Sequence, residues 1–380
     1  MSLQPSTGRL PRRDLLLLPL VSLLTVVLMA GFAELACRVM FPADETTACR
    51  VRDPVLGYRN KPGCSDTLKA FEAERVVNQY NDCGYRSAGS CRPVPAGTSR
   101  VALIGSSVGA GHFVSYGDSL GTQIGERLAQ ECHRPIDVQN LSATEYYMKQ
   151  TQARATEALK LKPDLLVWVL TPYDVQVGDS DPPTFASTAP SAPPPLLVRL
   201  HSLLLTSRAF AVGQHLYYED VASYVPLFLL NKDKAGFLYR DYSPSWTERI
   251  ATFGRIDGTI ADAAKAAGVP LVVAFVPQRA QAALVKMTPP KGVDPYRLQQ
   301  AVQRIVEQQG GHFVDATPAL GRTPSPASLF LPLDGHLDGH GHRIVGRAIA
   351  DQLVDAKLPG FSECSPLSST ASAAGTPDGS

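Results

Sequence analysis

From residue 100 onward, short apolar runs alternate with longer stretches whose apolar residues recur at helical spacing. Runs that end at turn-forming residues predict buried strands, here at residues 100–105, 136–141, 165–171, 270–276 and 312–315. The longer stretches predict helices, here at residues 119–132, 149–161, 246–267, 295–309 and 340–355. Strands that alternate with helices are typical of a parallel sheet, so we expect a three-layer α/β/α fold with a flavodoxin-like strand order.

The beginning of the chain has a different pattern. Residues 1–13 are polar and contain three arginines and no acid, whereas Leu15 to Ala33 carries no charge. At about 1.5 Å per residue, such a helix nearly spans a hydrocarbon core of roughly 30 Å. Because the arginines lie only on the amino side, residues 1–13 are expected in the cytoplasm, with residues 14–36 as a transmembrane signal anchor. The rest of the chain is then expected on the periplasmic side of the membrane.

Two other export signals are alternatives to an anchor. A cleaved signal peptide is one, although its apolar region usually spans only about 7–15 residues. A lipoprotein signal is the other, because Leu35-Ala36-Cys37 has part of that pattern while Glu34 stands where an aliphatic residue is usual. Each alternative also exports the remainder of the chain.

Cysteine usage agrees with export. Beyond Cys37 the chain contains six cysteines, an even number that suits three disulfides outside the cytoplasm. Six cysteines allow 15 pairings, and the sequence alone does not choose among them. Proximity in the chain favours Cys49–Cys64 and Cys83–Cys91, which leaves Cys132 with Cys364. A metal site is a weaker alternative, because no C-x-x-C pair is present.

Three further segments lie outside the strand-and-helix pattern. Residues 45–98 are rich in Pro, Gly, Cys and charge, and predict a small disulfide-pinned β segment. Residues 176–245 interrupt the core with a proline-rich stretch followed by apolar segments, which either pack on the sheet or form a lid. Residues 361–380 are small and polar apart from Cys364, and predict a disordered tail.

A serine and a histidine at the ends of the core can provide chemistry. The apolar run Val101 to Ile104 breaks into a glycine-rich turn that contains Ser107. In a parallel sheet such a turn lies at the carboxyl edge, where active sites form. A serine hydroxyl needs a base, and the base needs an orienting group. We therefore predict Ser107 as a nucleophile, His336 as its base and Asp334 as the carboxylate that orients the base.

Neighbouring residues leave alternatives open. Ser106 and the Ser119 of Gly117-Asp118-Ser119-Leu120 are competing nucleophiles, although Asp118 or Ser119 is better placed to cap the following helix. Asp338 is a competing carboxylate. A histidine-rich loop that also contains His340 and His342 could bind a metal, but we expect none, and no cofactor.

These motifs resemble the SGNH (GDSL-type) hydrolase superfamily. The resemblance rests on Gly105-x-Ser107 with Gly111 four residues on, and on Asp334-x-His336 followed by Gly341-His342. It is strongest for the membrane-anchored branch that acetylates envelope polysaccharides. Later blocks of the family match Asp137 to Ser142, Lys162 to Asp174 and Gly268 to Pro277. The resemblance therefore implies that residues 99–358 form an SGNH hydrolase-like domain.

The oxyanion hole departs from the family pattern. In the family, a Gly and an Asn assist the amide of the nucleophile, and these positions are Ser142 and Tyr173 here; Ser106 replaces the family's Asp. Loss of a side-chain donor of this kind costs about two to three orders of magnitude in rate. Donors or pocket residues that could take its place are Ser107, Ser142, Tyr173, Asn140 and Asp174. Asp174 could equally be an ordinary turn residue, and the pair Gln278-Arg279 either contacts substrate or is solvated.

The resemblance implies a serine esterase or O-acyl (acetyl) transferase. Its substrate would be an O-acylated cell-envelope or exported polysaccharide, or a small acyl ester, with a secretion or acylation complex as a further partner. A net charge of +1, with no basic patch among aromatic residues, argues against nucleic acid. The altered oxyanion positions motivate an alternative, a degenerate protein that binds glycan or assembles a complex. A lipid-acting esterase is a weaker alternative.

Overall fold

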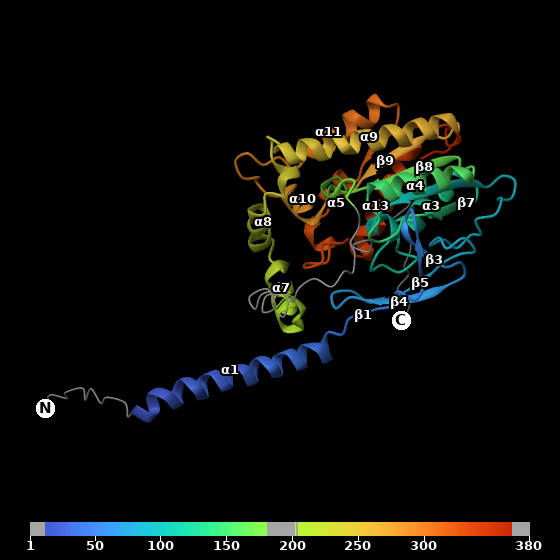
Figure 1. The fold of residues 1–380 in the computed structure, drawn as a ribbon. Helices are drawn as coiled ribbons and strands as arrows, with labels where there is room; N and C mark the ends of the chain where they lie inside the picture. The colour runs from blue at the N-terminus through green and yellow to red at the C-terminus, as the bar shows by residue number, and fades with distance from the viewer. Residues whose placement is uncertain (1–11, 181–201, 203, 367–380) are drawn as a thin grey trace, which may run out of the picture. The chain divides into compact units, whose positions relative to one another are not determined.

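The protein is described by a computed structural model that covers residues 12–180, 202 and 204–366. Its contacts divide the chain into two compact units (Figure 1). One contains the described residues of Met1–Pro42 and Ser191–Leu216, and the other those of Ala43–Pro190 and Tyr217–Ser380. Each unit is described by itself.

The first unit is built around the apolar helix α1 (Arg12–Met40). Residues Leu17–Met40 are long and apolar enough to cross a membrane, and their side chains are exposed. This helix is compatible with either a membrane anchor or a signal peptide. The carboxylate of Glu34 accepts hydrogen bonds from the amides of Arg208 and Ala209, each at 3.0 Å, at the start of α7 (Arg208–Glu219). Glu34, which stands where a lipoprotein signal usually has an aliphatic residue, therefore caps the amino-terminal end of α7.

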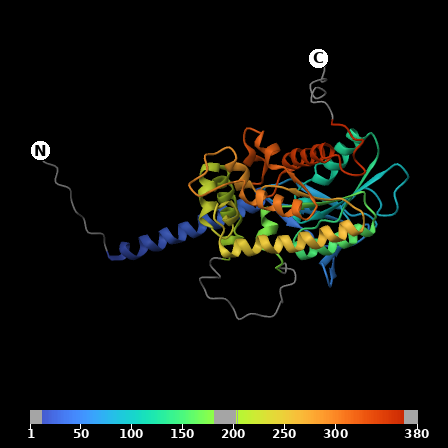
Figure 2. The same cartoon turned by 90° about the horizontal axis from the view of Figure 1, so that it is seen from above.

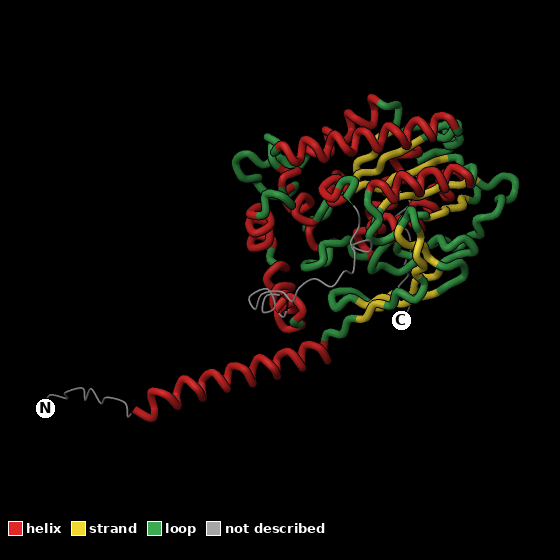
Figure 3. The backbone as a smooth tube through the Cα atoms, viewed as in Figure 1, coloured by secondary structure: helices red, strands yellow, loops and turns green. Residues whose placement is uncertain are grey.

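The second unit contains a five-stranded sheet in which every strand pair is parallel. The strand order is β10-β9-β8-β6-β7, which is flavodoxin-like when the strands are renumbered along the chain (Figure 3). The strands are β6 (Ser99–Gly105), β7 (Ile136–Asn140), β8 (Leu165–Leu170), β9 (Leu271–Phe275) and β10 (His312–Asp315). The predicted fold class and strand order are confirmed.

Helices cover both faces of this sheet, as Figure 2 shows for the long α9 on one side and α13 on the other. Alternate side chains of the strands point to opposite faces. Ile104, Trp168 and Phe275 pack against one set of helices, which comprises α4 (Met148–Lys160), α9 (Pro244–Ala266) and α11 (Arg297–Gln308). Leu103 and Val167 pack against the other set, α3 (Leu120–Cys132) and α13 (Gly339–Asp355). Burial on both faces explains why the strands are continuously apolar.

The five predicted helices are these same five, with ends shifted by at most two residues. Local signals account for several ends. The Ser243 hydroxyl accepts from the Trp246 amide and Pro244 occupies the first turn of α9, while Asp338 caps α13. The remaining elements of the core unit are short: α2 (Ser107–Ala110), α5 (Pro172–Val177), α8 (Val221–Leu230), η2 (Gly236–Leu238), α10 (Arg279–Leu284), α12 (Thr317–Gly321) and η3 (Pro326–Leu329).

The N-terminal segment, residues 45–98, forms small antiparallel sheets, as the sequence predicted. The strands are β1 (Asp44–Glu45), β2 (Arg50–Asp53), β3 (Gly57–Asn60), β4 (Ser65–Lys69) and β5 (Arg75–Gln79). They pair as β1-β4-β5 and β2-β3. The two disulfides that chain proximity favoured, Cys49–Cys64 and Cys83–Cys91, are present, and so is the pair that they left, Cys132–Cys364.

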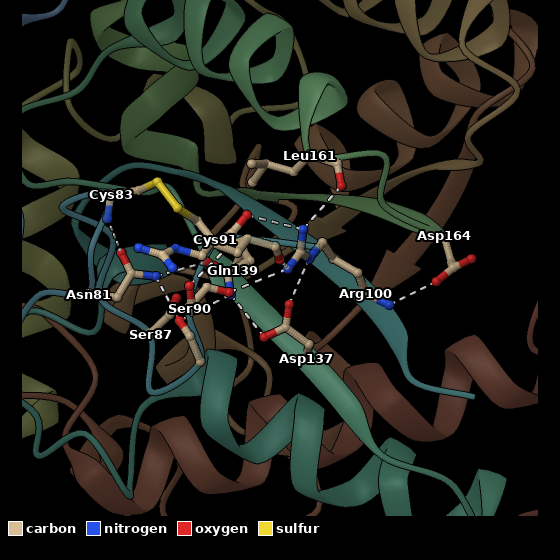
Figure 4. Close-up of polar contacts among 12 residues, drawn as sticks. Asn81, Cys83, Ser87, Ser90, Cys91, Arg100, Asp137, Gln139, Leu161 and Asp164 are labelled. Atoms are coloured by element: carbon tan, nitrogen blue, oxygen red, sulfur yellow. Dashed lines mark hydrogen bonds and ion pairs between the residues drawn. A yellow bond between two sulfur atoms is a disulfide. The ribbon is translucent and has the colours of Figure 1, made fainter. Parts of the chain in front are cut away.

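A buried arginine joins the N-terminal segment to the sheet (Figure 4). Arg100 on β6 is only 2% exposed and forms a 2.6 Å ion pair with Asp137 on β7. Its guanidinium also donates to the carbonyl oxygen of Arg92 at 2.6 Å. Beside it, Gln139 accepts from the Asn81 amide at 2.9 Å. These contacts hold the loop closed by Cys83–Cys91 against the amino-terminal part of the sheet.

The predicted insertion and tail are only partly described. Residues 181–201 and 203 of the insertion, and residues 367–380 of the tail, lie outside the described residues. Within the insertion, α8 packs on the core through Val225, which supports the interpretation of a packing helix. The tail prediction excepted Cys364, which is disulfide-bonded, but it is wrong for Phe361, which is fully buried.

Candidate active site

Ser107 lies directly after β6, at the carboxyl edge of the sheet. Gly105 ends the strand with φ of 148°, and a Cβ at this position would approach the carbonyl oxygen of Val169 to 2.6 Å. Glycine is therefore required where the chain turns away from the sheet. Ser107 is the first residue of the short helix α2, and Ser106 precedes it as the N-cap. Amides in the first turn of a helix lack intrahelical acceptors, so the Ser107 amide is placed to serve an oxyanion.

His336 and Asp334 lie in a tight turn before α13. The turn is closed by a hydrogen bond of 2.8 Å from the Leu331 amide to the His336 carbonyl, with Gly335 at φ of 88°. His336 Nε2 lies 2.6 Å from Ser107 Oγ, and His336 Nδ1 hydrogen-bonds to Asp334 Oδ1. The three residues that the sequence proposed are therefore brought together, although 229 positions separate Ser107 from His336.

The electrostatics suit a carboxylate that orients an imidazole. Burial alone would raise the pKa of Asp334, but the hydrogen bond and charge of His336 outweigh it and lower that pKa below its usual value. Asp334 Oδ1 also accepts from the backbone amide of His336 at 3.1 Å. Asp334 therefore stays ionised and orients the His336 ring through Nδ1.

Two aromatic residues after the nucleophile flank His336. The His112 and His336 ring centroids are 5.3 Å apart, and Phe113 meets the His336 ring edge-on at 5.7 Å. Burial, and then the neighbouring His336, lower the pKa of His112 to about 3. His112 is therefore a neutral wall of the site. Sequence reasoning missed it, although its position five residues after Ser107 was a visible signal.

Ser106 and Asp174 form a separate buried contact. The Asp174 carboxylate accepts from the amide and the hydroxyl of Thr171, each at 2.7 Å, and from Ser106. Burial raises the pKa of Asp174, and these hydrogen bonds offset part of that rise. Asp174 therefore completes the capping box at the start of α5. The Ser106 hydroxyl is directed to Asp174, which leaves Ser107 as the serine at His336.

The oxyanion candidates at residues 140 and 142 bond mainly to one another. The Ser142 amide donates to Asn140 Oδ1 at 3.1 Å, and Asn140 Nδ2 donates to the Gly109 carbonyl at 2.8 Å. The donor of the Asn140 side chain is thus directed to the nucleophile's own helix. Ser142 Oγ is buried without a hydrogen-bond partner among the described residues, and it lies where a Cβ on Gly109 would come within 2.6 Å.

Tyr173 is directed away from the role proposed for it. Its side chain is 45% exposed, and its ring packs edge-on against Tyr147 at 6.4 Å. Burial and a hydrogen bond with Tyr147 raise the pKa of the Tyr173 hydroxyl. The Tyr173 hydroxyl is therefore held by Tyr147. Position 173 is where the resembled family has an asparagine.

A comparison with known protein families identifies this arrangement. Residues 239–377 match the family model described as "SGNH hydrolase-like domain, acetyltransferase AlgX". Over residues 239–377 the chain is therefore similar to an SGNH hydrolase-like domain. The matched residues include Asp334 and His336 but not Ser107, so the Ser107 half of the site rests on its geometry.

Solved structures similar to this chain include lipases and esterases. The lipase/acylhydrolase from Enterococcus faecalis has 13% identity and a TM-score of 0.40, with 71% of this chain and 100% of that chain covered. The extracellular lipase from Streptomyces rimosus has 9% identity and a TM-score of 0.37, with coverages of 67% and 99%. The esterase EstA from Pseudoalteromonas sp. has 8% identity and a TM-score of 0.37, with coverages of 68% and 98%. No curated protein sequence matches the chain.

The competing residues that the sequence offered have structural partners. Ser119 is buried, and its hydroxyl donates to the Tyr116 carbonyl at 2.8 Å. Asp338 accepts from the Gly341 amide and caps α13. His342 is fully buried, and its Nδ1 accepts from the Leu120 amide at 3.2 Å. Arg279, expected at a solvated rim or at a substrate, is 2% exposed and donates to the Pro332 carbonyl at 3.1 Å.

A small polar cavity lies between the N-terminal segment and the nucleophile's loop. Its volume is about 40 Å³. The N-terminal segment supplies Arg50, Tyr58 and Asp66 to its walls, and the loops that follow β6 and β7 supply His112 and Ser142. A cavity of this size and polarity suits a few water molecules. It gives the buried Ser142 hydroxyl a place to find a partner.

Proposed function

We propose that this protein is a serine-dependent esterase or O-acyl transferase in which Ser107 is the nucleophile. The observation that carries the proposal is the hydrogen-bonded chain from Ser107 Oγ through His336 to Asp334. The family match indicates esterase or acetyltransferase activity at a coarser level. Both activities use the same acyl-enzyme chemistry, so one site serves either outcome.

The reaction would proceed in two steps. His336 Nε2 takes the proton of Ser107 as Oγ attacks the acyl carbonyl, and the imidazolium then gives that proton to the departing alkoxide. The C–O bond of the substrate breaks as the Ser107 ester forms. In the second step, water or a sugar hydroxyl gives its proton to His336 and attacks the acyl carbonyl. The bond between the acyl carbon and Ser107 Oγ then breaks, and the imidazolium returns the proton to Oγ. Exclusion of water at that stage would favour transfer over hydrolysis.

An O-acylated polysaccharide outside the cytoplasm is the proposed substrate. The family description names an acetyltransferase, which supports an acetyl ester as the acyl group. The apolar helix α1 and three disulfides support a chain that is exported and held at the membrane. A complex of envelope proteins for secretion or acylation is the corresponding partner.

The test uses the full-length chain in detergent, with a fluorophosphonate probe and p-nitrophenyl acetate. Wild type should be labelled and should turn over the ester. Ser107→Ala and His336→Ala should each lower turnover by about a thousandfold or more. Ser119→Ala is the control, since Ser119 lies in the literal Gly-Asp-Ser-Leu motif and its loss should leave labelling intact. Labelling that survives in Ser107→Ala would contradict the proposal.

A second candidate function is glycan binding or complex assembly without turnover. It is favoured by the occupied donors on the oxyanion side, where Asn140 bonds to Gly109 and Tyr173 contacts Tyr147. Wild type that is as inert as Ser107→Ala, yet is retained by partially acetylated xylan, would support this function. A preference for long-chain esters over acetyl esters would instead favour a lipid-acting esterase.

A further inference from the structure

The N-terminal segment reaches the loop that carries Asp334 and His336. Glu72 lies at the tip of the hairpin between β4 and β5. One of its carboxylate oxygens accepts from the Leu333 amide at 2.8 Å, and the other accepts from the Asp334 amide at 2.9 Å. A side chain more than 250 positions away thus binds the backbone of the candidate catalytic carboxylate.

These two bonds complete the hydrogen bonding of the turn. Within the turn, the Leu331 amide donates to the His336 carbonyl and the Gly335 amide donates to the Leu331 carbonyl. The amides of residues 333 and 334 are directed to Glu72 instead. Hydrogen bonds to an ionised carboxylate are shorter and roughly twice as strong as neutral ones. Glu72 therefore sets the backbone from which Asp334 projects toward His336.

The same segment also holds the nucleophile's loop. Arg86 is 6% exposed, and one guanidinium nitrogen donates to the carbonyls of Ala110 and Gly111, each at 2.8 Å. The other terminal nitrogen donates to the Val114 carbonyl at 2.6 Å. These carbonyls lie at the end of α2 and just beyond it, where helix carbonyls lack intrahelical donors. Glu72 and Arg86 therefore connect the two loops that meet at Ser107 and His336.

Disulfides and an ion pair fix the N-terminal segment that contacts both loops. Cys49–Cys64 precedes the β4–β5 hairpin in the chain, and Cys83–Cys91 follows it. The Arg100 contacts described above join the second of these loops to the sheet (Figure 4). The hairpin that carries Glu72 is therefore flanked on both sides by disulfide-closed loops.

We propose that Glu72 is a positioning residue for the reaction, so that the N-terminal segment is a working part of the active site. The proposal rests on the proposed function. Glu72 acts through the backbone of Asp334, which holds that carboxylate on His336 Nδ1 while Nε2 faces Ser107. Misplacement of reacting groups by about 1 Å can lower a rate by about a hundredfold.

The experiment compares Glu72→Gln with Glu74→Gln in the full-length chain. Glu74 is an exposed carboxylate two residues away on the same hairpin tip. Glutamine at position 72 keeps one acceptor but turns an amide N–H toward a backbone N–H. For Glu72→Gln we expect kcat on p-nitrophenyl acetate to fall about 10- to 100-fold with KM within about twofold, and labelling by fluorophosphonate to slow in parallel. Glu74→Gln should match wild type, and Glu72→Asp should recover part of the rate.

Hydrogen exchange separates positioning from folding. Amide exchange in the peptide that spans residues 331–336 should be faster in Glu72→Gln, with an unchanged melting temperature. Faster exchange without a loss of kcat would overturn the positioning role, and unchanged exchange would show that the carboxylate does not hold this loop. A wild type without esterase activity would overturn the proposed function instead, and the exchange rates would still report whether Glu72 holds the turn.

Discussion

The two sides of the candidate site differ in how their polar groups are used. On the proton-transfer side, Asp334, His336 and Ser107 bond to one another in a continuous chain that ends at the serine hydroxyl. On the oxyanion side, the Ser142 amide and the Asn140 side chain bond inward, and the Tyr173 hydroxyl is held by Tyr147. The polar groups of one side form a chain that ends at the serine, whereas the Asn140 and Tyr173 donors of the other side already have partners.

This difference shows that a nucleophile with its base does not by itself make an efficient hydrolase. Proton transfer requires donors and acceptors that are hydrogen-bonded to one another. An oxyanion hole instead requires donors that have no other protein acceptor, so that they can bind the negative charge that develops on the substrate oxygen. The Ser107 amide at the start of α2 meets that requirement by its position. The side-chain donor that the resembled family supplies at position 173 is absent. We therefore expect a low kcat, limited by weak stabilisation of the oxyanion.

The largest effect is expected from restoring the missing donor. Tyr173→Asn puts back the amide of the resembled family, and kcat on p-nitrophenyl acetate should rise by up to about 100-fold. KM should change little, because the added hydrogen bond forms mainly in the transition state. The measurement is steady-state kinetics on the full-length chain.

Tyr147→Phe provides a control for that gain, since it frees the Tyr173 hydroxyl without adding an amide. A rate that falls in Tyr173→Asn would show that the tyrosine itself supports the oxyanion. The oxyanion side would then supply a working donor as the proton-transfer side does, and the difference drawn between the two sides would be wrong.

A smaller effect is expected on the proton-transfer side, through pH. The folded-state pKa of His112 is about 3, because the ring is buried beside His336 and the positive charges of Arg50 and Arg86. As pH falls below about 6.5 the unfolded chain takes up this proton first, so stability is lost progressively toward pH 3. Between pH 6.5 and 5 the loss from His112 is at most about 2 kcal/mol.

His112→Phe should therefore flatten the decline of stability with acid, as chemical denaturation at several pH values would measure. Replacement of the exposed His340 by asparagine provides the comparison, and should flatten the decline less. An identical slope in wild type and His112→Phe would mean that His112 is charged in the folded site. The site would then hold a charged His112 beside His336.

The smallest effect is expected from Ser142→Ala. The Ser142 hydroxyl is buried without a partner among the described residues, so its removal should be neutral or should stabilise the fold by about 1 kcal/mol. Activity should stay within about twofold, because only the hydroxyl is lost. Ser119→Ala is the matched comparison, since that hydroxyl donates to Tyr116 and its loss should destabilise by about 1 kcal/mol. A clear loss of stability in Ser142→Ala would show that water in the adjoining cavity satisfies the hydroxyl.

Local patterns predicted most of the scaffold. A strand buried on both faces must be continuously apolar, and its helices must repeat at helical spacing, so these elements were visible one segment at a time. The turn after Gly105 and the pair Asp334 and His336 were visible for the same reason, since each motif lies within a few residues. Chain proximity also sufficed for Cys49–Cys64 and Cys83–Cys91.

Contacts between distant residues were not visible, because spacing along the chain says nothing about them. The sequence placed Asn140, Asp174 and Arg279 as pocket candidates, whereas packing turned their polar atoms to neighbouring backbone or to Thr171. The sequence also marked Glu72 and Arg86 only as charged residues of the N-terminal β segment, and it gave no sign of their contacts with the two loops of the site. The sequence by itself determined the sheet, its flanking helices and the candidate pair Ser107 and His336. Only the tertiary structure decided which polar groups are consumed in pairing and which remain for chemistry, because each buried donor or acceptor bonds to whatever partner the fold brings within reach.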